Sequence, residues 1–183
     1  MSARGAIFLD RDNTIVADPG YLHEPRLVRL LPRAADGLRS MSEAGWPLIV
    51  VSNQSGIARG MFGPDAYHAV MERMAELLEP HGVRILADYF CSHLPVSSGP
   101  CECRKPGTLL FRTAAKGHDL DLAKSWFVGD RWRDIAPGLA LGGRGVLIGA
   151  PADPADAEEA SRRGVSRAPD LTGAARIIGS GGT

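Results

Sequence analysis

Apolar and polar positions alternate along the chain in two kinds of block. Short continuous apolar runs, which are typical of buried strands, are separated by stretches whose apolar residues recur at helical spacing. The pattern predicts strands over residues 6–9, 47–51, 85–90, 126–128 and 145–148, and a short one near Val165. It predicts helices over about 31–45, 64–80, 108–116, 134–141, 155–163 and 170–178.

Strands separated by helices imply right-handed crossovers and a mostly parallel sheet that is covered on both faces. We therefore predict one three-layer α/β/α domain of Rossmann type over residues 1–183. Only about twenty residues separate Thr14 from the next helix, which is room for a long functional loop but not for a large cap domain. The glycine-rich end, residues 179–183, is predicted to be disordered.

Composition narrows the classes of partner. The formal net charge is zero, from 21 basic and 21 acidic residues, which argues against nucleic-acid and membrane-surface binding. No apolar run approaches the ~20 residues of a membrane span, and the first residues lack the pattern of a signal peptide. We expect a cytoplasmic, monomeric protein. A small phosphorylated ligand remains compatible with a net charge of zero, because such a ligand needs only a local basic site.

Two carboxylates follow the first predicted strand at once. Asp10 and Asp12 are spaced i, i+2, and in an extended chain this spacing points both side chains the same way. Two like charges side by side favour a bound cation, and their hard oxygen atoms suit Mg²⁺.

Other polar residues also follow apolar strands or stand just before a helix. Ser52 follows the second strand, Asp130 and Asp134 follow the fourth, and Lys105 precedes a helix. In a doubly wound sheet these positions converge on one crevice. Three carboxylates can hold Mg²⁺, and a carboxylate beside the metal can attack phosphorus while a second one serves as general acid and base. Lys105 and the Ser52 hydroxyl would then hold the phosphoryl oxygens.

The chain's three cysteines gather in one segment with a histidine. Cys91, His93, Cys101 and Cys103 form a C-x-H…C-x-C set, which supplies the four ligands of a tetrahedral structural Zn²⁺. The alternative is three ordinary thiols and a surface histidine. Residues 94–100 show no helix or strand pattern, so a zinc clip would order the loop and would also fix Lys105.

The order DRDNT, VVSNQSGIARG, CRKP and VGDRWRD resembles the haloacid-dehalogenase (HAD) superfamily of phosphatases over residues 6 to about 150. The resemblance implies that Asp10 is a nucleophile that forms an aspartyl-phosphate. It also implies that Asp12 is the general acid/base and binds Mg²⁺ through its backbone carbonyl, that Asp130 is a third metal ligand, and that Asp134 supports the site. Asn13 stands where relatives usually carry glycine, and Asn tolerates the left-handed backbone that this position would need.

The zinc loop narrows the resemblance to the D-glycero-D-manno-heptose 1,7-bisphosphate phosphatases and the related histidinol-phosphate phosphatases. The run NQSGIARG is more similar to the heptose enzymes, and so is the segment that begins at Asp18. Their resemblance implies removal of the C7 phosphate, in the synthesis of nucleotide-activated heptose for bacterial surface glycans such as lipopolysaccharide. It implies substrate contacts by residues 18–21 and 52–55 and by basic residues, among which Arg131 replaces the usual lysine; the named positions are Asp18, Gly20, Tyr21, Asn53, Gln54, Ser55, Arg104, Lys105 and Arg131.

Three hypotheses about function remain open from the sequence. The first is a Mg²⁺-dependent heptose bisphosphate phosphatase, and the second is the same chemistry on histidinol phosphate. The third is a zinc-stabilised binding module without catalysis, which Asn13 alone favours and which the complete set of acidic residues opposes.

Overall fold

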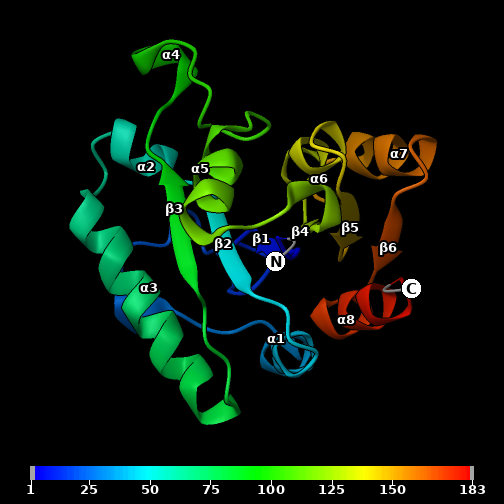
Figure 1. Ribbon diagram of the computed structural model, residues 1–183. Coiled ribbons are helices and arrows are strands. Elements are labelled where there is room, and N and C mark those ends of the chain that lie inside the picture. The colour runs from blue at the N-terminus through cyan, green and yellow to red at the C-terminus, as the bar shows by residue number, and fades with distance from the viewer. Residues whose placement is uncertain (1–2, 182–183) are drawn as a thin grey trace.

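A six-stranded sheet forms the centre of the protein (Figure 1). The computed structural model describes residues 3–181, and within them every neighbouring pair of strands in this sheet is parallel. The strands are β1 (Ile7–Leu9), β2 (Leu48–Asn53), β3 (Ala87–Cys91), β4 (Trp126–Gly129), β5 (Arg144–Ile148) and β6 (Ser166–Ala168). The predicted parallel sheet is confirmed.

Helices cover both faces of the sheet, which confirms the predicted α/β/α layers (Figure 1). One face packs against α1 (Ala34–Glu43), α3 (Pro64–Leu78) and α8 (Leu171–Ser180). The other face packs against α5 (Leu109–His118), α6 (Trp132–Ala140) and α7 (Pro154–Arg162). Among residues 3–181, no helix combines the length and the apolar character that a bilayer crossing requires.

The residues of strand β1 are all apolar because both faces of this strand are buried. Ile7 and Leu9 point into the core beneath α1, α3 and α8, whereas Phe8 points to the opposite face. There the Phe8 ring stacks on Phe127 of β4, with ring centroids 5.0 Å apart, and meets Phe111 of α5 edge-on at 5.5 Å. A strand that is buried on both faces reads as a continuous apolar run, and such a run is what the sequence contains.

The strand order β3-β2-β1-β4-β5-β6 places a reversal of direction between β1 and β4. The chain first adds strands on one side of β1 and then continues on the other side. In open α/β sheets the crevice at such a switch point, outside the carboxyl ends of the strands, is where ligands bind. Asp10 follows β1 and Asp130 follows β4, so both carboxylates lie at this crevice.

The structure differs from the sequence prediction in short segments. Two four-residue helices, α2 (Ser55–Ala58) and α4 (Pro95–Ser98), lie where the apolar pattern predicts none, because one turn is too short to show a period. Helix α8 continues to Ser180, so the prediction of disorder from residue 179 is wrong for its first two residues. Residues 182–183 lie outside the described part of the chain.

Candidate active site

Lys105 lies at the floor of the crevice between two carboxylates. Its Nζ is 2.6 Å from Oδ1 of Asp10 and 2.7 Å from Oδ1 of Asp134, and it donates to the Val51 carbonyl at 2.6 Å. The side chain is 2% exposed. Burial lowers the pKa of Lys105, but Asp10 and Asp134 raise it more, so the net shift is upward and the ammonium stays charged.

Asp10, Asp130 and Asp134 form a compact acidic cluster beside this lysine. Each offers one carboxylate oxygen, and these atoms all lie within 4.8 Å of one another. Burial and the negative charges of Asp10 and Asp134 raise the pKa of Asp130 to about 7. Burial likewise raises the pKa of Asp134 to about 6, although Lys105 opposes the shift. Three crowded, hard oxygen donors, two of them with a raised pKa, fit a divalent cation such as Mg²⁺.

The acidic cluster differs in one member from the predicted ligand set of Asp10, Asp12 and Asp130. It contains Asp134, and the carboxylate of Asp12 is not part of it. This arrangement is compatible with the resemblance, which assigns only the backbone carbonyl of Asp12 to the metal. Gly129 makes room for Asp134, because a Cβ at Gly129 would lie 2.4 Å from the Cβ of Asp134.

The carboxylate of Asp12 is held by a buried arginine, Arg11. Arg11 has no exposed surface, and it donates from Nε to Oδ1 of Asp12 at 2.8 Å and from Nη2 to Oδ2 at 3.0 Å. Its Nη2 also reaches Oε1 of Gln54 at 3.2 Å, and its guanidinium lies 5.3 Å from the Tyr67 ring centroid. Burial raises the pKa of Asp12 and Arg11 opposes that rise, with a net upward shift. Sequence reasoning missed Arg11, although a charged residue between two candidate acids was a usable signal.

Residues 52–54 are tied to the same network, with roles that the sequence did not predict. The amide Nε2 of Gln54 donates to Ser52 Oγ at 2.6 Å and to Asp12 Oδ2 at 3.0 Å. Ser52 is 1% exposed and is not among the residues that line the cavity. Its Oγ accepts from Gln54 and keeps its own O–H to donate, so its contact with a phosphoryl group stays a prediction. Asn53 pairs with the backbone of Lys105, accepting from its N–H at 2.9 Å and donating to its carbonyl at 3.2 Å.

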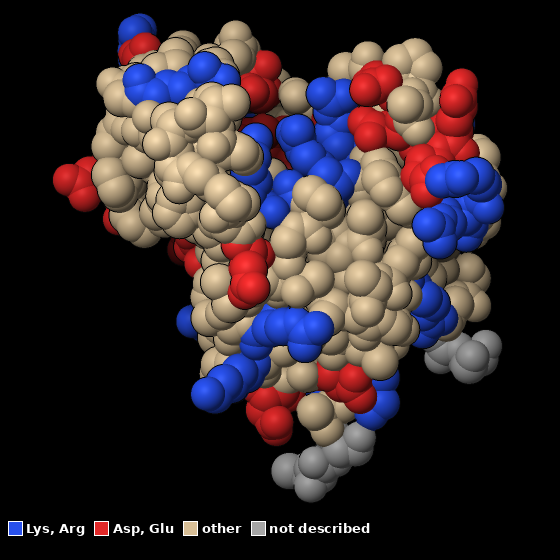
Figure 2. Space-filling view, turned by 90° about the horizontal axis from the view of Figure 1, so that it is seen from above, with Lys and Arg blue, Asp and Glu red and all other residues tan. Residues whose placement is uncertain are grey.

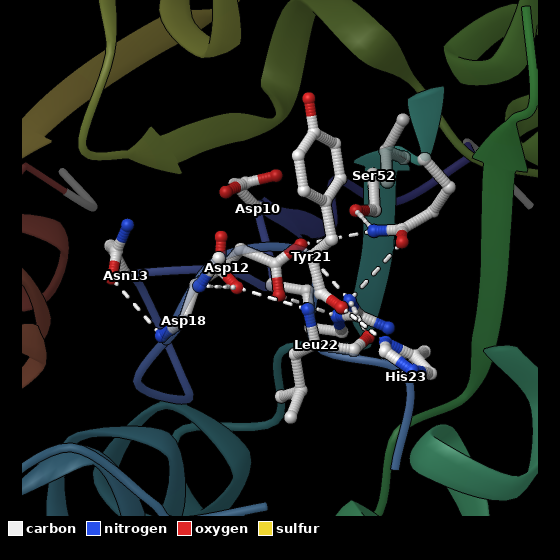
Figure 3. A network of polar contacts seen from close by, with 12 residues as sticks. Asp10, Asp12, Asn13, Asp18, Tyr21, Leu22, His23 and Ser52 are labelled. Atoms are coloured by element: carbon white, nitrogen blue, oxygen red, sulfur yellow. Dashed lines mark hydrogen bonds and ion pairs between the residues drawn. The ribbon is translucent and has the colours of Figure 1, made fainter. Parts of the chain in front are cut away.

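The loop after Asp12 is shaped by Asn13 and Asp18 (Figure 3). Asn13 has a φ of 57°, the left-handed backbone that the sequence predicts for it, and its Oδ1 accepts from the Asp18 N–H at 3.2 Å. Asp18 Oδ1 accepts from the N–H groups of Gly20 and Leu22, each at 3.0 Å. Gly20 does not line the cavity, and its part in the loop is its φ of 105°, which favours glycine.

These residues surround one cavity of about 370 Å³. Figure 2 shows basic side chains gathered around a hollow with acidic side chains deeper inside. The predicted site residues that line it are Asp10, Asp12, Asp18, Tyr21, Asn53, Gln54, Ser55, Arg104, Lys105, Asp130 and Arg131. Arg59 and Arg133 also line it and were missed. The signal for Arg133 was its position two residues after Arg131, and for Arg59 its place in the NQSGIARG run.

The four predicted zinc ligands converge at one end of the cavity. Sγ of Cys91 lies 3.7 Å from Sγ of Cys101 and 2.9 Å from that of Cys103, and Nδ1 of His93 lies 3.1 Å from Sγ of Cys103. Tetrahedral zinc with ~2.3 Å bonds to sulfur requires sulfur atoms about 3.8 Å apart. The Cys91–Cys101 distance matches this value and the Cys91–Cys103 distance is shorter, and the ligand atoms of all four residues lie within 4.8 Å of one another, as a metal site requires. Arg104 follows the last cysteine and donates from Nη1 to the His93 carbonyl at 3.3 Å.

Comparison with known proteins places this geometry among phosphatases. A family model described as HAD-hydrolase-like matches residues 102–174. The D-glycero-beta-D-manno-heptose-1,7-bisphosphate 7-phosphatase of Yersinia pestis is 40% identical over 149 residues, which cover 78% of this chain and 79% of the relative. The D-glycero-D-manno-heptose-1,7-bisphosphate 7-phosphatase of Thermosynechococcus vestitus is 38% identical over 154 residues, 79% of each chain.

Solved structures agree with these relatives. The D,D-heptose 1,7-bisphosphate phosphatase from B. bronchiseptica, a complex with magnesium and phosphate, superposes with a TM-score of 0.86 at 27% identity. The match covers 97% of this chain and 99% of that one. The corresponding enzyme from Burkholderia thailandensis gives a TM-score of 0.72 at 25% identity, over 97% and 99% of the two chains.

Proposed function

Because the chain belongs to the D-glycero-D-manno-heptose-1,7-bisphosphate 7-phosphatase family of HAD-like hydrolases, we propose that it removes the C7 phosphate of that bisphosphate. The observation that carries the proposal is the contact between Asp10 and Lys105, 2.6 Å apart, inside an acidic cluster and under a rim of arginines. A nucleophile, a cation for the phosphoryl oxygens and a metal site therefore occupy one crevice. The enzyme is a HAD-type phosphatase.

The reaction follows from the positions of two carboxylates. An Asp10 oxygen attacks phosphorus, the bond from phosphorus to the sugar oxygen breaks, and Asp12 gives its proton to that leaving oxygen. The raised pKa of Asp12 favours the protonated form that this step needs. Asp12 then takes a proton from water, which attacks phosphorus, releases inorganic phosphate and regenerates Asp10. Mg²⁺, held by Asp10, Asp130 and the Asp12 carbonyl with Asp134 in support, would offset charge on the phosphoryl oxygens.

The second phosphate of the substrate needs cations away from this cluster. Arg104 and Arg131, which the resemblance predicts to contact substrate, line the cavity, and Arg59 and Arg133 add two further positive charges. Guanidinium groups bind phosphate oxygens in a planar, bidentate geometry. A rim of four arginines therefore favours a doubly phosphorylated sugar over a substrate with one phosphate.

A direct comparison of substrates tests the proposed function. Purified protein with Mg²⁺ should release phosphate from the heptose 1,7-bisphosphate with a kcat/KM at least about 10-fold above that for histidinol phosphate, because a lost charged contact costs about 1.5–3 kcal/mol. Both anomers of the bisphosphate should be assayed. A higher kcat/KM for histidinol phosphate would contradict the substrate assignment, and failure to hydrolyse even p-nitrophenyl phosphate would favour a binding module without catalysis.

We also propose that a structural zinc ion is bound by the cluster of Cys91, His93, Cys101 and Cys103. Cys103→Ser should lower the zinc content from about one ion per chain to none, because a structural site needs all four ligands. We expect KM to rise about tenfold through the loss of order at Arg104. The kcat should change little. The sequence predicts that the zinc clip also fixes Lys105, but contacts with Asn53, Asp10 and Asp134, all outside the loop, hold this lysine as well.

Elemental analysis and steady-state kinetics measure both effects. Val96→Ser changes an exposed side chain of the same loop and should leave zinc content and KM unchanged. A Cys103→Ser protein that retains a full equivalent of zinc would contradict the proposed ligand set.

A further inference from the structure

One acidic side chain of helix α7, that of Asp156, contacts the start of helix α6 at the rim of the active-site cavity. Asp156 is the third residue of α7. Its Oδ1 accepts from the backbone N–H of Trp132 at 3.1 Å, and its Oδ2 lies 3.4 Å from Nη1 of Arg131. The side chain of Asp156 is 18% exposed and that of Arg131 is 28% exposed, so water screens this pair only in part.

Both ends of this contact are fixed by other interactions. The backbone N–H of Arg131 donates to Asp134 Oδ2 at 3.1 Å, so only the guanidinium of Arg131 is left to be placed. On α7, Asp153 caps the first turn by accepting from the Ala155 N–H at 3.0 Å. Ala160, further along the helix, is fully buried in the small cluster that joins α7 to α6 and β5. Asp156 therefore projects from a rigid support.

The contact leaves Arg131 free to bind an anion. It uses Nη1 only, and a guanidinium carries five N–H donors, so Nε and Nη2 can still meet a phosphate. Arg133, two residues on, is exposed and lines the same cavity, and within the described residues no hydrogen bond or ion pair is recorded for it. Of these two arginines, Arg131 is thus the one that a contact from α7 holds in place.

We propose that Asp156 is a positioning residue that holds the Arg131 guanidinium toward the cavity for the phosphate that is not transferred. This inference rests on the proposed function, because it takes a bisphosphate as substrate. Fixing a long side chain before binding removes part of the entropy that binding would otherwise cost. Asp156 therefore acts on affinity for the second phosphate, and the transfer step at Asp10 is unaffected.

Asp156→Asn separates this role from simple support of the helix. Asparagine keeps an oxygen that accepts from the Trp132 N–H but loses the charge that attracts Arg131. We expect KM for the heptose 1,7-bisphosphate to rise about 2- to 5-fold with kcat within about twofold, the range for a partly exposed ion pair. Hydrolysis of p-nitrophenyl phosphate, which has no second phosphate, should not change. Asp156→Ser, with a smaller side chain, should give the same split.

Two further variants complete the test. Glu158→Gln removes the same charge from an exposed position of α7 and should leave the kinetics of both substrates unchanged. In an Arg131→Ala background, Asp156→Asn should have no further effect on KM, because the side chain that it positions is gone. Equal losses on both substrates, or full additivity with Arg131→Ala, would overturn the proposal. Wild-type protein that is inactive on the bisphosphate would instead overturn the proposed function, and this inference with it.

Discussion

Replacing Asp10 with asparagine should lower kcat for phosphate release by about 10⁴-fold or more, because the variant has no carboxylate to form the phosphoenzyme. The amide is nearly the same size and keeps an oxygen that can accept from Lys105 Nζ, so the fold and the metal-free site should survive. The measurement is phosphate release under saturating bisphosphate with Mg²⁺. Acid quenching of the wild-type enzyme with radiolabelled substrate should also trap labelled protein, and the variant should trap none.

A matched control for this variant is Asp36→Asn, on the exposed side of α1. This substitution makes the same chemical change at an exposed position that is distant in sequence from Asp10, so the variant should retain the wild-type kcat. Substantial activity in Asp10→Asn would mean that another group attacks phosphorus. Asp12 could not easily replace it, because Arg11 and Gln54 hold the Asp12 carboxylate with three hydrogen bonds.

The layers of the fold could be predicted from the sequence because the central strands β1, β2 and β4 are buried on both faces. Ile7, Phe8 and Leu9 form one apolar run, since alternate residues serve two different cores. The order of strands could not be obtained in this way, because hydrophobic periodicity carries no information about which strands are neighbours. The reversal between β1 and β4, which creates the crevice, is a property of the connections alone.

Residues that react could be predicted from the sequence more readily than residues that support them. Asp10, Asp130 and Lys105 stand next to strand ends or helix starts, and chemistry demands their residue types. Arg11, by contrast, is fully buried and bonded to residues of two other loops. Its position between two candidate acids was a usable signal, but the burial and these two contacts depend on the tertiary fold. Asp156 reaches Arg131 across 25 positions of sequence, and such a contact depends on how α7 packs on α6.

Lys105→Met should damage both catalysis and stability, because the lysine is the buried partner of two carboxylates. We expect kcat to fall about 10²- to 10³-fold through the loss of a cation at the phosphoryl oxygens. Without Mg²⁺ at pH 7.5, the free energy of unfolding should fall by about 3–5 kcal/mol, since the variant leaves buried charges without their partner. Urea unfolding measures the second effect, and Lys116→Met, on the exposed side of α5, is the matched control.

The dependence of this stability loss on pH and Mg²⁺ identifies its cause. The pKa values of Asp130 and Asp134 are already raised to about 7 and about 6, and removing Lys105 raises that of Asp134 further. Carboxyl groups whose pKa is higher in the folded protein than in the unfolded chain bind protons more tightly when folded. The free energy of unfolding that they contribute therefore increases as pH falls below about 7.

The stability loss of Lys105→Met should accordingly shrink between pH 7.5 and pH 5. Mg²⁺ at pH 7.5 should reduce the loss in the same way, by neutralising the acidic cluster. If neither low pH nor Mg²⁺ reduces this loss in the free energy of unfolding, the lysine stabilises the protein through the packing of its aliphatic chain. Repulsion within the acidic cluster would then not be the cause of the loss.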